Sequence, residues 1–439
     1  MTTRKALHAR RDESRPRRWP LVLTALICAI AVIAASLIWI NQREQTASQS
    51  AQSATNATNK PPSDDHDGRQ PTDKQSDDQS DTTTNAAKPA SGTTPQEKAA
   101  NAVADMSLEE QVGQLIMAPL TYGSDASALS DMITDRHVGS VVLIGAWQNG
   151  VDGVKASTDV LQGYAPDGNR LIVATDQEGG QVQHLSGAGF DAMPSASAQG
   201  QMPTQTLRSN AAGWGRSLAK AGINVDLAPV ADTVTVDRAS NAPIGALDRD
   251  FALDAAGNAS HAAAFLDGLR DAGVQGTLKH YPGLGSVTGN TDFTTEGIID
   301  TTTTLDGAEI GAFTTAIGQG KPGMVMMSLA TYQAIDPNAP AAFSSTIIDG
   351  HLRGTTGYDG VVISDSLSAA AVSGIQPSEL GVRFVEAGGD IACIGDPSYV
   401  QPIIDGLLAR AKSDPDFAKK VAKSATRVMT LKYRMGLAK

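Results

Sequence analysis

Side chains capable of acid–base chemistry follow several apolar segments of the sequence. Three of these segments end in such groups: Asp176 and Glu178, Lys279 and His280, and Asp365. Two carboxyl groups in one site can cleave a glycosidic bond, because one attacks or stabilises the anomeric carbon while the other protonates the leaving oxygen. Lys and His side chains can hydrogen-bond sugar hydroxyls beside them. Glycoside hydrolysis is therefore one chemistry that these residue types allow.

Other chemistries fit the sequence less well. The glycines of the segment 279–293 have the spacing GxGxxxG, one residue longer than the dinucleotide fingerprint, and no acidic residue ends a strand about twenty positions later. The chain has no Walker-type GxxxxGK[ST], no HExxH and no GxSxG, and its seven histidines show no ligand pairing. Paired carboxylates remain, and they need water but no metal or other cofactor.

Short apolar runs alternate with helical patterns along most of the chain. The runs cover 114–120, 139–145, 171–179, 224–232, 276–283, 323–331, 360–366 and 390–396. Helices are expected between them, for example at 204–222 and 258–273, and Ser107 with Glu110 has the spacing of a capping box. Eight such units predict a (β/α)8 TIM-type barrel over residues 102–439, with a doubly wound open sheet as the alternative. In a barrel the polar strand ends converge on one face, where active sites lie.

The N-terminal hundred residues have a different character. Residues 1–18 carry seven Lys or Arg against two acids, and 19–41 contain an uncharged apolar run of roughly 33 Å as a helix. This predicts a transmembrane signal anchor with the basic segment in the cytoplasm and the catalytic domain outside the cell membrane, on the cell-wall side. The alternative is a cleaved signal peptide and a secreted protein. Residues 42–101 are too polar to form a core and predict a disordered linker.

Charge and cysteine content exclude further classes of function. The net charge is −12, and no basic cluster follows the N-terminal segment, which argues against a nucleic acid partner. Of the two cysteines, Cys28 lies in the predicted membrane segment and Cys393 in an apolar run, so neither a disulfide framework nor a thiolate metal site is expected.

Five motifs in order along the chain resemble those of glycoside hydrolase family 3, and in particular its β-N-acetylhexosaminidase branch. They read DQEGGQVQHL (176–185), APVADT (228–233), IGALDRDF (244–251), KHYPGLG (279–285) and GVVISDSLSAAAV (360–372). The resemblance extends from about Leu108 to Leu437. It implies a retaining enzyme that removes terminal β-linked N-acetylglucosamine from peptidoglycan-type or related glycans through a covalent glycosyl-enzyme.

Individual residues match the family's functional positions. The resemblance places the nucleophile at Asp365 and the sugar-binding groups at Asp176, Arg249, Lys279 and His280. The Ser-Leu that follows Asp365, in place of the Trp of the β-glucosidase branch, favours N-acetylglucosamine over glucose. A β-glucosidase or β-xylosidase of the same family is the alternative among enzymes.

Two positions depart from the family pattern. Gln181 stands where the DQEGGR motif has Arg, and the Asp-x-His dyad that serves many relatives as acid/base reads Asn290-Thr291-Asp292. We therefore expect Asp292 to act directly as general acid and then base, with a raised pKa. Two alternatives follow: Asp292 only caps a turn while Asp248 or Asp250 supplies the proton, or the domain is an inactive sugar-binding protein.

Overall fold

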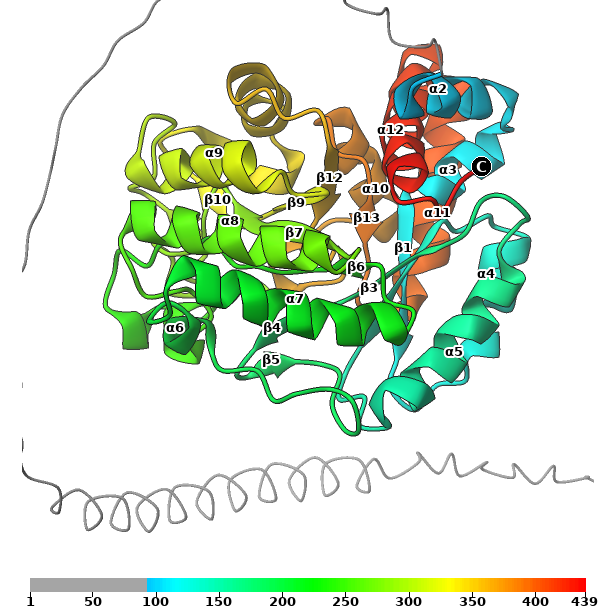
Figure 1. Cartoon of the computed structure of the whole chain (residues 1–439). Helices are drawn as coiled ribbons and strands as arrows, with labels where there is room; N and C mark the ends of the chain where they lie inside the picture. Colours follow the sequence, from blue (N-terminus) through cyan, green and yellow to red (C-terminus); the bar gives the residue numbers. More distant parts are fainter. Residues whose placement is uncertain (1–92) are drawn as a thin grey trace, which may run out of the picture. The chain divides into compact units, whose positions relative to one another are not determined.

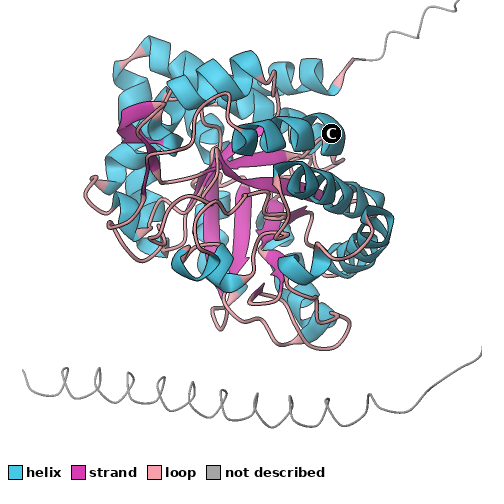
Figure 2. Ribbon diagram, turned by 90° about the vertical axis from the view of Figure 1, so that its left-hand side faces the viewer, coloured by secondary structure: helices cyan, strands magenta, loops and turns pink. Residues whose placement is uncertain are grey.

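The computed structural model describes residues 93–439, in which helices surround a central parallel sheet (Figures 1 and 2). The strands of that sheet are β1 (Ile116–Thr121), β2 (Ser140–Ile144), β3 (Ile172–Thr175), β6 (Val225–Asp226), β7 (Gln275–Tyr281), β9 (Met324–Met327), β12 (Val361–Ser364) and β13 (Ala392–Cys393). Each of the eight apolar runs in the sequence overlaps one of these strands, and β1 and β7 each extend one residue beyond their run. The predicted strands are therefore all present, although several are shorter than the runs.

The sheet closes into a barrel. Its order is β12-β9-β7-β6-β3-β2-β1-β13, so every strand lies beside the next one in the chain, and each named pair is parallel. The two end strands meet at a parallel bridge between Ile363 and Ile391, where Ser364 N donates to Ile391 O at 3.0 Å. A doubly wound sheet would reverse its order and keep two free edges. The predicted (β/α)8 barrel is confirmed.

Alternate residues of the strands form the barrel interior. Val142, Leu227, Met326 and Cys393 belong to the apolar cluster inside the barrel, and they come from the second, fourth, sixth and eighth strands or the residue just after. Four side chains from alternate strands make one packing layer in this fold. The residues between them face the surrounding helices, so both faces of each strand are buried. This is why the strands read as nearly continuous apolar runs.

Helices cover the outside of the barrel (Figure 2). They are α2 (Pro95–Asp105), α3 (Leu108–Gln114), α4 (Ser130–Thr134), α5 (Gly150–Tyr164), α6 (Ala196–Gln199), α7 (Thr204–Lys220), α8 (Ala255–Asp271), α9 (Ala308–Gly320), α10 (Pro377–Glu386), α11 (Val400–Ser413) and α12 (Pro415–Arg434). The predicted helix at 204–222 is α7. The helix predicted at 258–273 is α8, which begins three residues earlier because Asp254 caps it by accepting from Gly257 N at 2.8 Å.

The folded domain begins earlier than residue 102. Helix α2 starts at Pro95, inside the range predicted for the disordered linker, and Thr94 with Glu97 forms a capping box at its start. Its buried residues are Ala99 and Val103, and the helix packs against α12. The predicted boundary is wrong because an alanine-rich helix with so few large apolar residues has the composition of a linker. The capping box predicted at Ser107 and Glu110 is confirmed at the start of α3.

The predicted segments 1–18 and 19–41, and the linker up to residue 92, lie outside the described residues. Within 93–439, none of the helices combines the length and apolar character that a membrane crossing requires. The membrane anchor therefore stays a prediction from the sequence.

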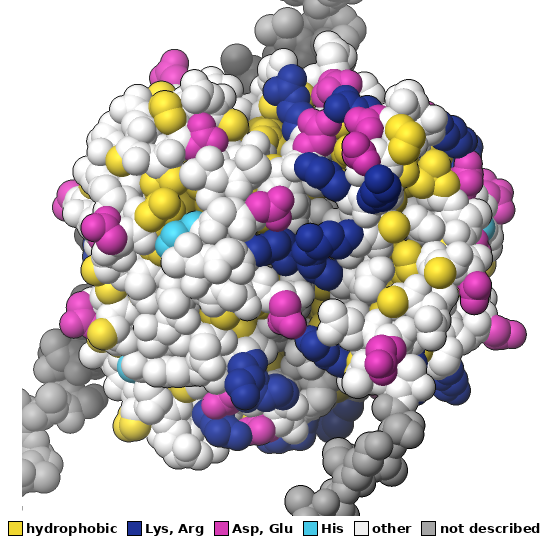
Figure 3. Space-filling model, turned by 90° about the horizontal axis from the view of Figure 1, so that it is seen from above, with side chains coloured by type: hydrophobic (Ala, Val, Ile, Leu, Met, Phe, Trp, Pro, Cys, Tyr) yellow, Lys and Arg dark blue, Asp and Glu magenta, His cyan; other side chains and the backbone are white. Residues whose placement is uncertain are grey.

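Charged side chains of both signs are interspersed on the face seen in Figure 3, where Lys and Arg lie in groups beside Asp and Glu. Exposed ion pairs of the described chain include Lys412 with Glu109 and Lys419 with Asp416, each at 2.8 Å. Exposed pairs of this kind contribute about 0–1 kcal/mol each, so they add little to the stability of the barrel.

Small sheets extend the loops on the C-terminal side of the barrel strands. Strands β4 (Gln177–Gly179) and β5 (Val182–Gln183) form a hairpin directly after β3. Strand β10 (Thr331–Tyr332), which follows β9, pairs with β8 (Ile299–Asp300) and β11 (Asp336–Pro340). These loops carry the polar residues that the sequence places after the strands.

Candidate active site

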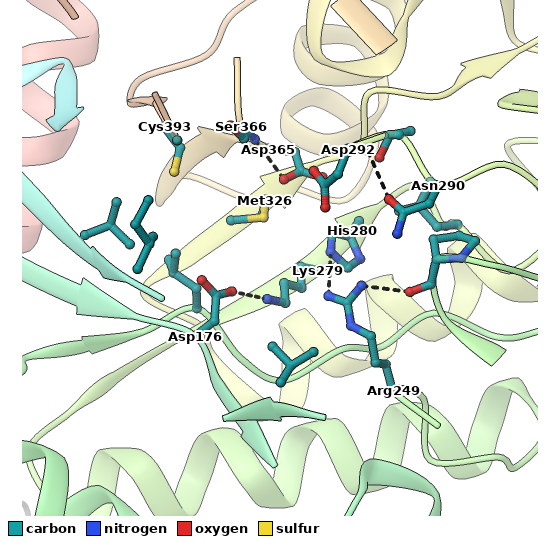
Figure 4. Close-up of a pocket in the computed structure, with 18 of the residues that line it drawn as sticks. Asp176, Arg249, Lys279, His280, Asn290, Asp292, Met326, Asp365, Ser366 and Cys393 are labelled. Carbon is teal, nitrogen blue, oxygen red and sulfur yellow. Dashed lines mark hydrogen bonds and ion pairs between the residues drawn. The ribbon is translucent and has the colours of Figure 1, made fainter. Parts of the chain in front are cut away.

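A cavity of about 330 Å³ opens at the C-terminal ends of the barrel strands (Figure 4). Its floor is the layer of Val142, Leu227, Met326 and Cys393 from the barrel interior. All six residues predicted for the site line its walls: Asp176, Arg249, Lys279, His280, Asp292 and Asp365. Residues up to 189 positions apart, from Asp176 to Asp365, therefore meet in one place.

A bulge in β7 turns two neighbouring side chains into the cavity. Leu278 pairs with Val325 and Tyr281 with Met327, so β7 uses one residue more than β9 between these two points. Successive side chains of a regular strand point to opposite faces, but a bulge re-aims them. Lys279 and His280 can therefore both line the cavity.

Lys279 is the centre of a buried ion network. Its Nζ lies 2.5 Å from Asp176 Oδ1 and 2.6 Å from Glu178 Oε1. Arg249 binds the same Glu178 with two nitrogens, Nε to Oε2 at 2.9 Å and Nη2 to Oε1 at 2.7 Å. The side chains of Lys279 and Glu178 are only 2% and 3% exposed. Two cations thus face two carboxylates in a place with little water.

The network keeps its members charged. Burial alone would raise the pKa of Glu178, but the charges of Arg249 and Lys279 hold that pKa well below its ordinary value. Burial likewise opposes the charge of Lys279, yet the neighbouring Asp176 and Glu178 raise the pKa of the ammonium group. These groups therefore present fixed donors and acceptors, which suits the recognition of sugar hydroxyls.

Asp232 orients His280. Its Oδ2 accepts from His280 Nδ1 at 2.7 Å, and its Oδ1 accepts from the backbone nitrogens of His280 and Leu284 at 3.2 and 3.0 Å. Asp232 is fully buried. Three hydrogen bonds to one carboxylate fix both the imidazole ring and the turn that follows β7.

Asp365 is the first residue after β12. Its backbone nitrogen donates to Met327 O at 3.0 Å, which continues the pairing of β12 with β9, and its Oδ1 accepts from Ser366 N at 2.8 Å. The carboxyl group is half-buried and points into the cavity, as Figure 4 shows. Since it emerges from a strand of the barrel, its position is set by the sheet.

Asp292 comes from the loop between β7 and β8, and backbone bonds hold this loop over the cavity. Ala370 N donates to Asp292 O at 3.2 Å and Ala371 N donates to Thr291 O at 3.0 Å. Both donors belong to a short 3-10 helix, η6 (Ala370–Val372), that follows Asp365. At the base of the loop, a Cβ on Gly289 would lie 1.9 Å from Glu296 O, so the chain needs glycine there.

The surroundings of Asp292 favour its protonated form. Asp292 is exposed at the rim of the cavity, where neighbouring protein atoms replace part of the water around its carboxyl group. This burial raises the pKa of Asp292 to about 6, the charge of Asp365 adds to the shift, and Arg249 and His280 oppose it. A carboxyl group with a raised pKa, in the same cavity as a second carboxyl group, is the arrangement that general acid catalysis by a glycosidase requires.

A family profile described as "Glycosyl hydrolase family 3 N terminal domain" matches residues 107–431. The chain belongs to glycosyl hydrolase family 3. The family and the enzyme class, glycoside hydrolase, that the five motifs predict are thereby confirmed.

Several relatives of this family 3 chain carry more detailed names. Beta-hexosaminidase LpqI of Mycobacterium tuberculosis is 33% identical over 338 residues, which are 74% of this chain and 83% of that protein. The crystal structure of a Beta-N-acetylhexosaminidase from Beutenbergia cavernae is 44% identical, with a TM-score of 0.73 over 76% of this chain and 99% of that chain. A family 3 beta-N-acetylglucosaminidase from Paenibacillus is 28% identical, with a TM-score of 0.66 over 76% of this chain and 63% of that chain.

Two other acids considered from the sequence do not line the cavity of this family 3 domain. Asp250 is buried in a two-nitrogen ion pair with Arg238, at 2.8 and 2.9 Å. Asp248 lies 3.5 Å from the same Arg238, and its side chain is 57% exposed. Neither is placed to protonate a ligand bound in the cavity.

The structure also shows the contacts of Gln181 and Trp147. Gln181, which replaces the family's Arg, is exposed and donates to Leu247 O at 3.4 Å. Trp147 is buried, and its indole nitrogen donates to Ile144 O at 3.0 Å. Its role in the described structure is packing.

Some residues of the site were not assigned to it from the sequence. Glu178 lies near the end of the run 171–179 and Asp232 ends the run 224–232, but their roles depend on contacts with distant segments: Glu178 pairs with Arg249 and Asp232 orients His280. His184 and Phe293 also line the cavity. A lone His and a lone Phe carry no sequence signal that separates them from core residues.

Asp226 is a further carboxyl group near the ion network. It is 1% exposed; one oxygen accepts from Gln177 N at 3.0 Å, and the other has no hydrogen-bond partner among residues 93–439. Burial raises the pKa of Asp226 well above its ordinary range, and the charges of Asp176 and Glu178 add to the shift against the opposing charge of Lys279. Burial therefore favours the protonated form of this carboxyl group.

Replacement of Asp226 by Asn should stabilise the fold increasingly as the pH rises above about 4. The unfolded carboxyl group ionises near pH 3.9, and the folded one ionises only at higher pH, so the wild type loses stability as the pH rises between the two values. Asn has the same shape and does not ionise. Urea unfolding should show a difference in the free energy of unfolding that grows with pH in this range.

The control for this comparison is Asp359→Asn. Asp359 is exposed, and the same change of charge at the surface should alter stability by no more than about 0.5 kcal/mol. An Asp226→Asn protein less stable than the wild type at pH 7 would show instead that Asp226 is ionised and paired in the fold.

Proposed function

We propose that this family 3 glycoside hydrolase removes terminal β-linked N-acetylglucosamine with retention of anomeric configuration. The observation that carries the proposal is the pair of carboxyl groups, Asp365 and Asp292, that enter one cavity from two loops bonded to each other. Retaining glycosidases need such a pair, one group as nucleophile and the other as acid and then base.

The reaction follows from these positions in two steps. Asp365 forms a bond to the anomeric carbon while the glycosidic bond breaks, and Asp292 gives its proton to the departing oxygen. Asp292, now a carboxylate, then takes a proton from a water molecule whose oxygen attacks the same carbon and releases Asp365. The products are the free sugar and the leaving group, and both carboxyl groups return to their starting forms.

The cavity suits a single terminal sugar. Its volume of about 330 Å³ is at the lower end of the range for ligand sites. Asp176, Lys279, His280 and Arg249 offer charged hydrogen-bonding groups to hydroxyls, as the family resemblance implies. The names of the relatives, beta-N-acetylhexosaminidase and beta-N-acetylglucosaminidase, support N-acetylglucosamine as the sugar. Peptidoglycan-type glycans as its source follow from the family resemblance alone.

The cellular location of the catalytic domain is also part of the proposal. The basic segment 1–18 and the apolar segment 19–41 support a single-pass anchor in the cell membrane that leaves the catalytic domain on the cell-wall side. Protease added to intact cells should then degrade the domain without lysis. Release of the domain into the medium would support a cleaved signal peptide instead, and protection from the protease would contradict both.

The test of the activity is a panel of 4-nitrophenyl β-glycosides presented to the full chain. We expect rapid release from the N-acetylglucosaminide and much slower release from the glucoside and the xyloside. NMR spectra recorded early in the reaction should show the β-anomer of the sugar first. Preferred cleavage of the glucoside or xyloside would overturn the sugar assignment, and an inactive but sugar-binding protein would overturn the catalytic proposal.

A further inference from the structure

Phe293 directly follows the proposed acid/base, Asp292, and lines the same cavity. Among the exposed large apolar side chains of residues 93–439, it has the largest exposed fraction, 81%. Single exposed apolar residues on a surface are ordinary. An aromatic ring at the rim of a ligand cavity is different, because a bound molecule can cover it and gain from the removal of apolar surface from water.

Hydrogen bonds hold the backbone of the turn that carries this ring. Phe293 N donates to Asn290 O at 3.0 Å, which closes the turn, and Asn290 Oδ1 accepts from Asp292 N at 3.0 Å. The carbonyl group of Asp292 accepts from Ala370 N at 3.2 Å. Because the turn is bonded internally and to the segment after Asp365, little backbone order has to be gained when a ligand binds.

The proposed reaction determines which part of a substrate reaches the ring. Asp365 and the ion network contact the sugar that is removed, while Asp292 must face the oxygen that joins this sugar to the leaving group. The cavity has room for little more than one sugar. The remainder of the substrate must therefore lie at the rim on the side of Asp292, where Phe293 is exposed.

We infer that Phe293 forms a leaving-group subsite, in which its ring packs against the apolar face of a second pyranose. This inference rests on the proposed function. A phenyl ring has no hydrogen-bonding group, so it recognises the C–H face of a sugar and not the pattern of its hydroxyls. The subsite should therefore accept different second sugars attached to the N-acetylglucosamine.

The kinetic test compares a substrate with a second sugar and one without. The ratio of kcat/KM for N,N′-diacetylchitobiose to kcat/KM for N-acetyl-β-glucosaminyl fluoride should fall about tenfold in Phe293→Ala and be kept in Phe293→Tyr. The matched control is Ile299→Ala, since Ile299 is 54% exposed in the same segment but does not line the cavity. Its ratio should equal that of the wild type.

An unchanged ratio in Phe293→Ala would overturn the inference. So would equal losses on both substrates, since an effect on the second sugar must fall on the disaccharide and not on the fluoride. If the wild type cleaved neither substrate, the proposed function would fail, and a binding measurement would still decide on the subsite.

That measurement is calorimetry on the Asp365→Asn protein with N-acetylglucosamine and N,N′-diacetylchitobiose. We expect tighter binding of the disaccharide, and loss of this preference when Phe293→Ala is added. A preference that is absent, or that survives the loss of the ring, would contradict the inference whatever the kinetic result.

Discussion

The Asp365→Asn protein is expected to lose at least about 10⁴-fold in kcat/KM on every substrate that the wild type cleaves. An amide has the shape of the carboxylate but carries no charge and cannot form the ester bond to the anomeric carbon. The variant should fold normally, because Asp365 is half-buried and its bond from Ser366 N can be accepted by the amide oxygen. The measurement is release of 4-nitrophenol from the N-acetylglucosaminide.

Asp359→Asn is the matched control. Asp359 precedes β12 and Asp365 follows it, so the two carboxyl groups flank one strand at opposite ends of the barrel. The control should keep the wild-type rate. Mass spectrometry provides a second readout: wild type treated with a 5-fluoro N-acetylglucosaminyl fluoride should gain the mass of one sugar, and Asp365→Asn should not. An adduct on the variant would place the nucleophile elsewhere.

Replacement of Asp292 by Asn should slow cleavage about 10²- to 10⁴-fold on substrates with poor leaving groups, such as disaccharides. The loss in the first step should be much smaller with 2,4-dinitrophenol, which departs without a proton. Azide should speed the second step of the variant, because this anion attacks the glycosyl-enzyme without help from a base, and the product should be the β-glycosyl azide.

The pH profile gives a separate test of Asp292. Since its pKa is raised to about 6 in the free enzyme, the acid is present below pH 6 and is lost as the pH rises through this value. We therefore expect kcat/KM of the wild type to fall tenfold per pH unit well above pH 6. This alkaline limb should be absent from Asp292→Asn.

Asp248→Asn serves as the control for both experiments. It removes an exposed carboxylate that the sequence offered as an alternative acid but that lies outside the cavity, so its rate and pH profile should match the wild type. The role of Asp292 would be excluded by full activity of Asp292→Asn on disaccharides. Loss of the alkaline limb in Asp248→Asn would transfer the role to Asp248.

The barrel could be predicted from sequence because its strands are buried on both faces. Runs such as GSVVLIG (139–145) are almost entirely apolar, and the charged residues of the barrel strands lie near their C-terminal ends. Chain connectivity then brings those strand ends to one face, which is why the sequence predicts that Asp176, Lys279 and Asp365 share one site. The boundary at residue 102 was wrong because helix α2 buries only small residues against α12.

The sequence by itself determined the eight-stranded architecture, the family and the types of residue at the strand ends, since each depends on local pattern or ordered motifs. Only the tertiary structure decided the positions and charge states within the site. Asp292 reaches the cavity because Ala370 and Ala371 bind its loop, and its pKa is raised because surrounding protein atoms replace part of its water and Asp365 lies near it. The tertiary structure also decides that Asp226 is buried and that the ring of Phe293 is exposed. Solvation and contact between distant segments are properties of the folded chain, and a linear pattern does not contain them.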